Sequence, residues 1–190
     1  MVEPMSTART RPVRVRTAHT ADLAPATLHA VRALLDAAFE GDFGEDDWDH
    51  TVGGVHAFVH DEHGLAAHGS VVQRRVLHRG RSLRTGYVEG VAVRADRRRQ
   101  GLGDAVMGTL EGVIDRAYVL GALGASDDGA ALYAARGWQV WSGRIAALGP
   151  DGVVPLPEEE GSLHVRPAAG AGLPDPSGAL FFDWRDGDLL

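Results

Sequence analysis

The stretch that decides the fold is Val91-Ala92-Val93-Arg94-Ala95-Asp96-Arg97-Arg98-Arg99-Gln100-Gly101-Leu102-Gly103. The residues before its turn follow the period of two that is typical of a strand. The apolar residues after it recur at spacings of four, four, three and four, namely Leu102, Val106, Leu110, Val113 and Ala117. That stripe indicates an amphipathic helix, so an apolar strand runs through an Arg-rich turn into a long helix that begins at Gly101.

The start of this helix is a candidate site for phosphate groups. Helix N-termini leave backbone N–H groups unpaired and carry a partial positive charge, and anions complement both. Gly101 and Gly103 let the backbone approach a ligand closely, and three consecutive arginines, Arg97, Arg98 and Arg99, attract a polyphosphate. The pattern is not a Walker loop, because the chain has no Lys, and it lacks the glycine spacing of a dinucleotide fingerprint.

Two other interpretations of this arginine cluster stay open. It is compatible with an ordinary capped helix after a basic turn, and with a patch that binds nucleic acid. The net charge of −7 and the few aromatic residues near the arginines disfavour nucleic acid. We therefore expect no nucleic-acid partner.

Upstream of this stretch, the pattern predicts a strand, a helix and an antiparallel meander. Val13 to Thr17 alternates apolar and charged residues as a strand does. Asp22 as N-cap and Pro25 in the first turn open a helix. The acidic residues 41–49 form a loop or a short helix. Meander strands are expected over 55–60, 65–77 and 82–93, joined by turns over 61–64 and 79–80.

Downstream, a short strand over 120–125 precedes an Ala-rich helix over 129–136, which Ser126 or Asp127 caps and Gly137 ends. A strand over 138–145, a loop over 149–161 and two final strands over 163–166 and 179–184 follow. This order indicates an α/β domain with a mixed central sheet flanked by helices, plus extra C-terminal strands. We expect a flexible N-terminal segment over residues 1–12 and a single domain over 13–190.

Composition excludes several classes of protein. A chain of 190 residues with 44% hydrophobic and 24% charged residues is the size of one globular domain. It has no Cys, which excludes a disulfide scaffold, a cysteine nucleophile and a thiolate metal site. No apolar run is long enough for a membrane span, so we expect no membrane partner and a cytoplasmic location. His56, His60 and His63 do not form a His-Glu-x-x-His motif, and we expect no metal.

Charge is segregated along the chain. Residues 40–62 hold eight acids and no Arg, a charge of −8, whereas residues 74–99 hold nine Arg and two acids, a charge of +7. Residues 151–190 hold eight acids and two Arg, a charge of −6. Such a chain is suited to presenting an anion site and a cation site on one domain, although each block is equally compatible with solvated loops.

Two motifs point to a known family. Arg98-Arg99-Gln100-Gly101-Leu102-Gly103 matches the Arg/Gln-x-x-Gly-x-Gly/Ala pyrophosphate loop, which follows a Val-Ala-Val strand. Leu132-Tyr133 followed by Arg136-Gly137-Trp138 is similar to a later helix with a tyrosine near the thioester sulfur. The chain thus resembles the GCN5-related N-acetyltransferase (GNAT) family. The resemblance implies a GNAT fold in which acetyl-CoA lies in a V-shaped splay between residues 88–93 and 120–125.

A closer resemblance spans most of the chain. The segments Gly41-Asp42-Phe43, Gln73-Arg74-Arg75, Gly86-Tyr87-Val88-Glu89-Gly90, Gly121-Ala122-Leu123 and Asp183-Trp184-Arg185 resemble the aminoglycoside 2′-N-acetyltransferases, enzymes of antibiotic resistance. It implies acetyl-CoA as donor, a polycationic aminoglycoside as acceptor, and a homodimer. The acceptor residues it implies are Asp42, Glu89, Gly90, Glu159, Asp188 and the terminal carboxylate of Leu190. This chain departs from such relatives, which carry Asp at position 159 and end in Trp; the run 158–160 is also compatible with a solvated face.

Glu89 is the candidate general base. An amine must lose a proton before it attacks an acetyl group, and most sugar ammonium groups are protonated near pH 7. Glu89 lies mid-strand in an apolar run, where a carboxylate is costly unless it faces a site. Strand alternation places it on one face with Tyr87, Val91 and Val93. Pairing with Arg74 or Arg84 is the structural alternative, and the resemblance implies that Glu89 works through a bridging water.

Tyr133 is the candidate general acid, which protonates the departing thiolate or donates a hydrogen bond to its sulfur. Simple packing on an Ala-rich helix is the alternative. The backbone of Val91, Ala92 and Val93 would hold the pantetheine arm and polarise the thioester carbonyl.

With no cysteine to carry the acetyl group, we expect direct transfer in a ternary complex. Two alternative functions stay open. One is acetylation of another cationic amine, such as a polyamine or a cell-wall amino sugar, and the other is a CoA-binding sensor without turnover.

Overall fold

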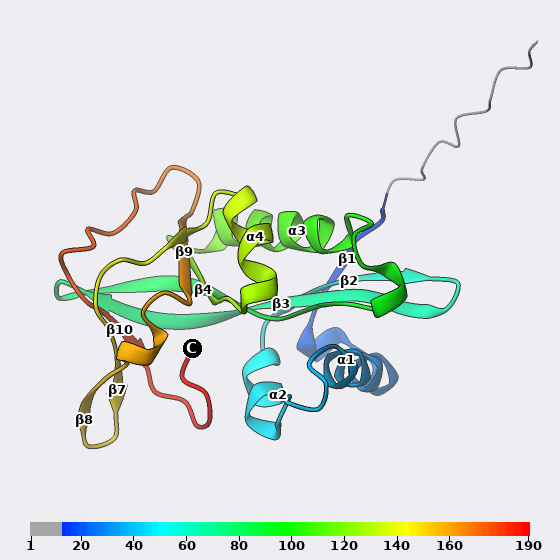
Figure 1. Ribbon diagram of the computed structural model, residues 1–190, viewed down its shortest axis with the longest axis horizontal. Coiled ribbons are helices and arrows are strands. Elements are labelled where there is room, and N and C mark those ends of the chain that lie inside the picture. Colours follow the sequence, from blue (N-terminus) through cyan, green and yellow to red (C-terminus); the bar gives the residue numbers. More distant parts are fainter. Residues whose placement is uncertain (1–12) are drawn as a thin grey trace, which may run out of the picture.

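Two long antiparallel strands, β3 (Gly64–His78) and β4 (Arg81–Val93), run through the centre of the computed structural model (Figure 1). The structure describes residues 13–190, apart from the side chains of Asp127 and Asp128, so the expected flexible segment over 1–12 lies outside the described residues. Both residues of the turn between the strands, Arg79 and Gly80, have positive φ, as a two-residue hairpin turn requires. The predicted strands over 65–77 and 82–93 are confirmed to within one residue.

The remaining strands extend this pair into a ten-stranded mixed sheet. The first half of β3 pairs with β2 (Val55–Asp61), which pairs with β1 (Arg16–His19). The second half pairs with β10 (Leu180–Asp183), followed by β7 (Ile145–Gly149) and β8 (Gly152–Pro155). Beyond β4 lie β5 (Leu120–Gly124), β9 (Leu163–Pro167) and β6 (Gln139–Val140). The pairs β4–β5 and β7–β10 are parallel and the others antiparallel, as the predicted mixed sheet requires.

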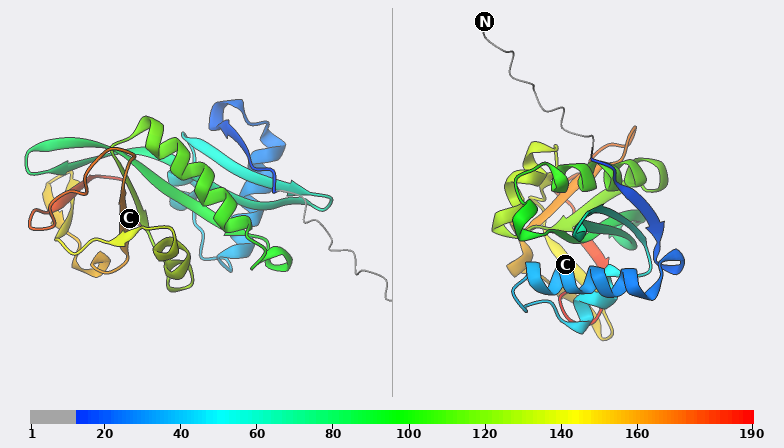
Figure 2. Two further views of the ribbon diagram at one scale, coloured as in Figure 1. Left: turned by 90° about the horizontal axis from the view of Figure 1, so that it is seen from above. Right: turned by 90° about the vertical axis from the view of Figure 1, so that its right-hand side faces the viewer.

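Helices cover both faces of the sheet (Figure 1, Figure 2). Helix α3 (Leu102–Ala117) packs on one face, and α4 (Asp127–Ala135) lies on the same side. Helices α1 (Pro25–Ala38) and α2 (Glu45–Thr51) lie on the opposite face. Three 3₁₀ turns complete the described part, η1 (Thr20–Asp22), η2 (Ala95–Arg97) and η3 (Pro157–Glu159). None of the helices in the described residues has the length and apolar content that a membrane crossing requires.

Three apolar clusters hold these layers together. The apolar stripe of α3 packs on β3 and β4 around Val106, Leu110 and Ile114, all fully buried. On the other face, Val31 and Leu35 anchor α1. A third cluster joins the C-terminal strands to the end of the β3–β4 hairpin. The stripe predicted for α3 is therefore the core contact of that helix, as its spacing indicates.

Four local predictions were wrong. The first strand begins at Arg16 rather than Val13, because its pairing with β2 is limited to residues 16–19. Asp22 lies in η1, and Ala24 is the N-cap of α1, which has no side-chain cap and begins at Pro25. The strand predicted over 138–145 is two strands, β6 and β7, which pair with β9 and β10 respectively. The predicted loop over 149–161 contains β8.

Candidate active site

The strands β4 and β5 separate near the middle of the sheet. They pair only over Thr85–Tyr87 against Leu120–Ala122. Beyond Tyr87, β4 continues to Val93 without a strand partner on that side among the described residues, whereas β5 stays paired with β9. The predicted splay between these strands is thus confirmed. Its open β4 edge presents backbone N–H and C=O groups that an extended chain can pair with.

A β-bulge in β4 begins where the two strands separate. Between the pairs Ser70–Glu89 and His68–Ala92, β4 has one residue more than β3. Gly90 lies in the bulge with a φ of 55°, a conformation that glycine adopts without strain. An added Cβ there would also lie only 3.1 Å from Thr51. The bulge explains why Gly90 occurs within an otherwise apolar strand.

The bulge reverses the alternation of side chains along β4. Val91 and Val93 pack with Val88 in the cluster under α3. Tyr87 packs in the C-terminal cluster on the other side, and Glu89 faces the same way. The prediction that all four odd-numbered residues share a face was therefore wrong, because the extra residue shifts the period of two by one. Glu89 reaches the splay from the side opposite α3.

The predicted phosphate loop joins β4 to α3. Gly101 caps α3 with a φ of 78°, and Arg99 is also left-handed, with a φ of 57°. Leu102 is buried and anchors the helix start, while Gln100 donates from its side chain to the Asp96 carbonyl at 3.1 Å. Gly103 lies in the first turn of α3 near Val93. The loop thus leaves the first N–H groups of a 16-residue helix at the end of the splayed strand.

Only part of the arginine cluster is free to meet an anion. Arg94 and Arg97 both bind the Asp61 carboxylate, at 2.7 and 2.5 Å. The hydrogen bond from Arg94 chiefly, and the charges of Arg94 and Arg97 to a smaller extent, lower the pKa of Asp61 to about 2, so it stays charged. Arg98 and Arg99 are exposed and form no ion pair with any described residue. The prediction that three consecutive arginines attract a polyphosphate is corrected to two.

Glu89 is a buried carboxylate held by an arginine. Arg185 Nη1 lies 2.5 Å from Glu89 Oε1, and both side chains are largely buried. Burial raises the pKa of Glu89, and the Arg185 charge opposes that rise. The arginine that pairs with Glu89 is therefore Arg185, not Arg74 or Arg84 as the structural alternative proposed. A carboxylate whose pKa is raised towards neutrality is suited to accept a proton reversibly.

The C-terminal segment forms one wall around Glu89. His50 Nε2 donates to the Asp186 carbonyl at 2.8 Å, which ties the segment to α2. Buried Arg74 donates to Asp183 and to the Leu189 carbonyl at 2.7–2.8 Å. A hollow of about 190 Å³ lies beside this wall, lined by Asp49, His50, Val52, Val72, Gln73, Arg74, Asp183, Trp184 and Arg185.

The chain end lies at the splay. A Cβ added to Gly124, at the end of β5, would lie 3.3 Å from the carboxyl carbon of Leu190 and 3.5 Å from the hydroxyl oxygen of Tyr87. That hydroxyl is buried without a hydrogen-bond partner among the described residues. Burial chiefly, then the charges of Glu89 and, to a smaller extent, Glu159, raise the pKa of Tyr87. The C-terminus is also seen below the centre of the sheet in Figure 1.

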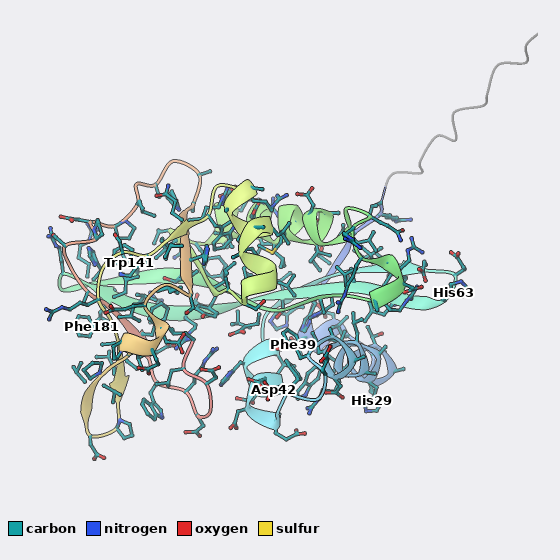
Figure 3. The ribbon with its side chains drawn as sticks, in the orientation of Figure 1. His29, Phe39, Asp42, His63, Trp141 and Phe181 are labelled. Carbon is teal, nitrogen blue, oxygen red and sulfur yellow. The ribbon has the colours of Figure 1, made fainter. Side chains whose placement is uncertain are left out.

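Most of the residues implied for the acceptor meet at this place. Glu159 lies in η3 and accepts a hydrogen bond from Ser162 at 2.8 Å. The Asp188 carbonyl accepts from Arg185 at 2.9 Å, and Asp188 is exposed. Asp42 lies in the α1–α2 loop on the same side of the sheet (Figure 3) but contacts none of the others. Neither Asp42 nor Glu159 is tied to Glu89 by a hydrogen bond or ion pair among the described residues.

Tyr133 lies on the other side of the splay, on α4. Its ring packs against Trp138 and His164, with centroids 6.4 and 6.1 Å away. Burial raises the pKa of its hydroxyl to about 12, and the hydroxyl makes no hydrogen bond to a described group. A tyrosine in that state keeps its proton at neutral pH and is able to donate it. The structure thus places Tyr133 in the core without removing the chemistry predicted for it.

The sequence interpretation assigned no role to Arg185 or His50, and it considered Arg74 only as a partner of Glu89. Arg185 binds a residue 96 positions earlier in the chain, and periodicity carries no signal for such a pair. The only available hint was the segment Asp183-Trp184-Arg185 within the resemblance. Among the described residues, no three His, Asp or Glu side chains gather as a metal site requires.

The sequence matches a known protein family. The family model described as an acetyltransferase (GNAT) domain matches residues 19–141, more than half of the chain. The chain belongs to the GNAT acetyltransferase family. This GNAT acetyltransferase is 48% identical over 179 residues to a Mycolicibacterium fortuitum protein named aminoglycoside 2′-N-acetyltransferase. The match covers 92% of this chain and 90% of that protein.

Solved structures agree on the fold of this GNAT acetyltransferase. A GNAT family N-acetyltransferase (YhbS) from Escherichia coli, solved in complex with CoA, superposes with a TM-score of 0.63 at 18% identity, covering 92% of this chain and 93% of that one. An acyl-CoA N-acyltransferase from Pseudomonas aeruginosa gives 0.58 at 19% identity, covering 81% and 99%. A probable N-acyltransferase from Enterococcus faecalis gives 0.57 at 13% identity, and this chain spans 33% of its length. The predicted family, GNAT fold and acetyltransferase class are confirmed.

Proposed function

We propose that this GNAT acetyltransferase transfers an acetyl group from acetyl-CoA to the 2′-amine of aminoglycosides, and thereby confers resistance to them. The observation that carries the proposal is a largely buried carboxylate, that of Glu89, which lies next to a bulge at the splay of β4 and β5. The name of the M. fortuitum relative supports the choice of acceptor.

The residues suited to hold acetyl-CoA lie along β4 and the start of α3. The open backbone edge of Val91, Ala92 and Val93 would pair with the pantetheine arm. Exposed Arg98 and Arg99, with the N–H groups at the loop from Gln100 to Gly103, would hold the pyrophosphate. The CoA complex of the E. coli neighbour supports this assignment of the fold. Bound acetyl-CoA supplies the acetyl group, and the chain supplies binding, orientation and proton transfer.

Two side chains move the protons. Glu89 accepts the proton of the acceptor's ammonium group through a bridging water, which leaves a neutral amine to form the new C–N bond. Tyr133 donates a proton to the sulfur as the C–S bond breaks. As the C–N bond forms, the amine nitrogen loses a second proton, which returns to Tyr133 through water and replaces the proton given to the sulfur. The products are the amide and the CoA thiol, and the reaction balances once Glu89 releases the first proton to solvent.

The acids around the splay attract a cation but raise the pKa of a bound amine, which opposes its deprotonation. Glu159, Asp188 and the Leu190 carboxylate would have both effects on a bound ammonium group. Arg185 acts in the opposite sense, because a guanidinium beside Glu89 lowers the pKa of an amine placed there. Arg185 thus offsets part of the cost of an acidic acceptor site.

The acceptor assignment is tested by substrate choice. We expect turnover with gentamicin and tobramycin, which carry a 2′-amine, and none with kanamycin A and amikacin, which carry a 2′-hydroxyl. CoA release measured with a thiol reagent reads this out, and the chain has no Cys to add background. Equal turnover of both groups would show that a different amine is acetylated. No turnover with either group would contradict the aminoglycoside assignment.

The pyrophosphate assignment is tested at Arg98 and Arg99. Replacing both with alanine is expected to raise KM for acetyl-CoA by about thirtyfold, since each charge-assisted contact contributes about 1 kcal/mol, with little change in kcat. The effect should shrink at high salt, because exposed charges are screened. Arg116→Ala, an exposed arginine at the opposite end of α3, is the matched control. An unchanged KM in the double variant would contradict the assignment.

Two alternatives differ in measurable ways. If a polyamine or a cell-wall amino sugar is the acceptor, that amine would be turned over in preference to a 2′-amino aminoglycoside. A CoA-binding sensor would bind CoA without turnover, so catalysis by the wild type would exclude it. We also propose a cytoplasmic location, supported by the absence of Cys, and a homodimer, which light scattering of the purified chain tests.

A further inference from the structure

Two fully buried histidines lie behind the bulge of β4. His56 comes from β2 and His68 from β3, and neither exposes any surface. His56 Nδ1 lies 2.8 Å from His68 Nε2, and His68 Nδ1 lies 2.8 Å from the Gly90 carbonyl oxygen. At the other end, Thr20 Oγ1 lies 2.7 Å from His56 Nε2. A chain of hydrogen bonds therefore runs from η1 through the sheet to the residue after Glu89.

The directions of both hydrogen bonds that His68 makes are determined. A carbonyl oxygen only accepts, so His68 Nδ1 carries a proton and donates it to the Gly90 oxygen. Burial lowers the pKa of His68 to about 3 and that of His56 to about 4, so both rings are neutral at pH 7. His68 Nε2 is then an acceptor, and His56 Nδ1 must be the donor to it. Each ring is thereby fixed in one tautomer and one orientation.

The chain does not carry protons from Glu89 to solvent. A relay needs a group that accepts and donates at each step, and the Gly90 carbonyl oxygen has no proton to pass on. No described acid or arginine contacts either ring; the titratable groups that affect them are each other and His19. A buried, neutral and fully directed chain of this kind fixes the position of the atom on which it ends.

The Gly90 carbonyl oxygen lies in the bulge of β4, between Glu89, whose side chain is on one face of the strand, and Val91, whose side chain is on the other. The bulge interrupts the ladder between β3 and β4, so the Gly90 peptide lacks a regular strand partner there. We propose that His68, oriented by His56, is a positioning residue for catalysis: it holds the Gly90 carbonyl and so keeps Glu89 and the Val91 backbone in place on opposite faces of the splay. This inference rests on the proposed role of Glu89.

The test replaces His68 with two residues whose side-chain amide stands in for one of its two ring nitrogens. The amide nitrogen of Asn occupies about the place of Nδ1, and the amide of Gln about that of Nε2. We expect His68→Gln, which loses the donor to Gly90, to lower kcat about ten- to a hundredfold, because a misplacement of about 1 Å costs up to 10²-fold. His68→Asn keeps that donor, and we expect a kcat near that of the wild type. KM for acetyl-CoA should stay the same in both.

A double-mutant cycle with Glu89→Gln shows whether His68 acts through Glu89. Once Glu89 is replaced, His68→Gln should lower kcat no further. The matched control is His78→Gln: His78 is also buried and donates from Nδ1 to a carbonyl, that of Ala179 at 3.2 Å, but at the far end of β3. It should lower thermal stability without lowering kcat.

The outcomes separate this inference from the proposed function. Equal losses of kcat in His68→Gln and His68→Asn, or the same loss with and without Glu89, would overturn the positioning role and leave Glu89 as the base. A Glu89→Gln variant with wild-type kcat would instead contradict the proposed function. If His68→Gln does not fold, His56→Gln tests the same chain one step further from Gly90.

Discussion

Replacing Glu89 with glutamine is expected to lower kcat by about 10²- to 10⁴-fold, the usual loss when a general base is removed. Glutamine has nearly the same shape and still accepts a hydrogen bond from Arg185. The fold and the C-terminal wall should therefore persist. KM for acetyl-CoA should not change, because its proposed contacts lie on the β4 edge and the loop to α3. Steady-state kinetics with a 2′-amino aminoglycoside measures both constants.

The pH dependence of kcat in the wild type and in Glu89→Gln gives an independent test of Glu89 as the base. The base acts when it is deprotonated, so activity is present above its pKa and is lost as the pH falls through it. Burial raises the pKa of Glu89 above the ordinary value for glutamate, despite Arg185, and moves this acid limb towards neutral pH. In the pH–rate profile of Glu89→Gln, the limb due to titration of Glu89 should be absent, and only the limb due to ionisation of the substrate amine should remain. An unchanged acid limb would assign the loss to another group.

A matched control exists for this prediction. Glu111 on α3 is also a largely buried glutamate bound by an arginine, Arg136, and it accepts a hydrogen bond from Trp138 at 2.9 Å. It lies outside the proposed site. Glu111→Gln should therefore lower stability, since it weakens a buried charge pair, without lowering kcat. If Glu89→Gln and Glu111→Gln affect kcat alike, the loss reflects the removal of a buried charge and not of a base.

The sequence predicted the site best where its residues are close along the chain. The loop from Val91 to Gly103 needs only a strand, a turn and a helix start, and each has a local signal. Glu89 was identified because a carboxylate in an apolar strand must have a partner or a function. The structure shows the partner, Arg185, which lies at the splay, and the function of Glu89 as a base is the one proposed above.

What the sequence did not reveal depends on contacts between distant residues. A bulge shifts the period of two by one, and a single glycine in a strand does not say on which side the shift occurs. Arg185 reaches Glu89 only because α2 and Arg74 hold the C-terminal segment back against the sheet. The split between β6 and β7 has the same cause, because each pairs with a strand that comes later in the chain.

Tyr133→Phe is the second substitution with a large expected effect. Removing a general acid that protonates the leaving thiolate should lower kcat by about 10²-fold. The ring packs against Trp138 and His164 in the core, and phenylalanine keeps that packing. Because the hydroxyl has no hydrogen-bond partner among the described groups, its loss leaves no buried group unsatisfied. Thermal stability should therefore be unchanged while kcat falls.

The measurement must report the chemical step. Product release limits kcat in many enzymes, and it would then hide a slower chemical step. Single-turnover experiments with enzyme in excess avoid this. Tyr118→Phe is the control, because burial also raises the pKa of Tyr118 but that residue ends α3 away from the splay. If Tyr133→Phe and Tyr118→Phe give equal single-turnover rates, the role of Tyr133 is packing; a loss confined to Tyr133→Phe requires its proton.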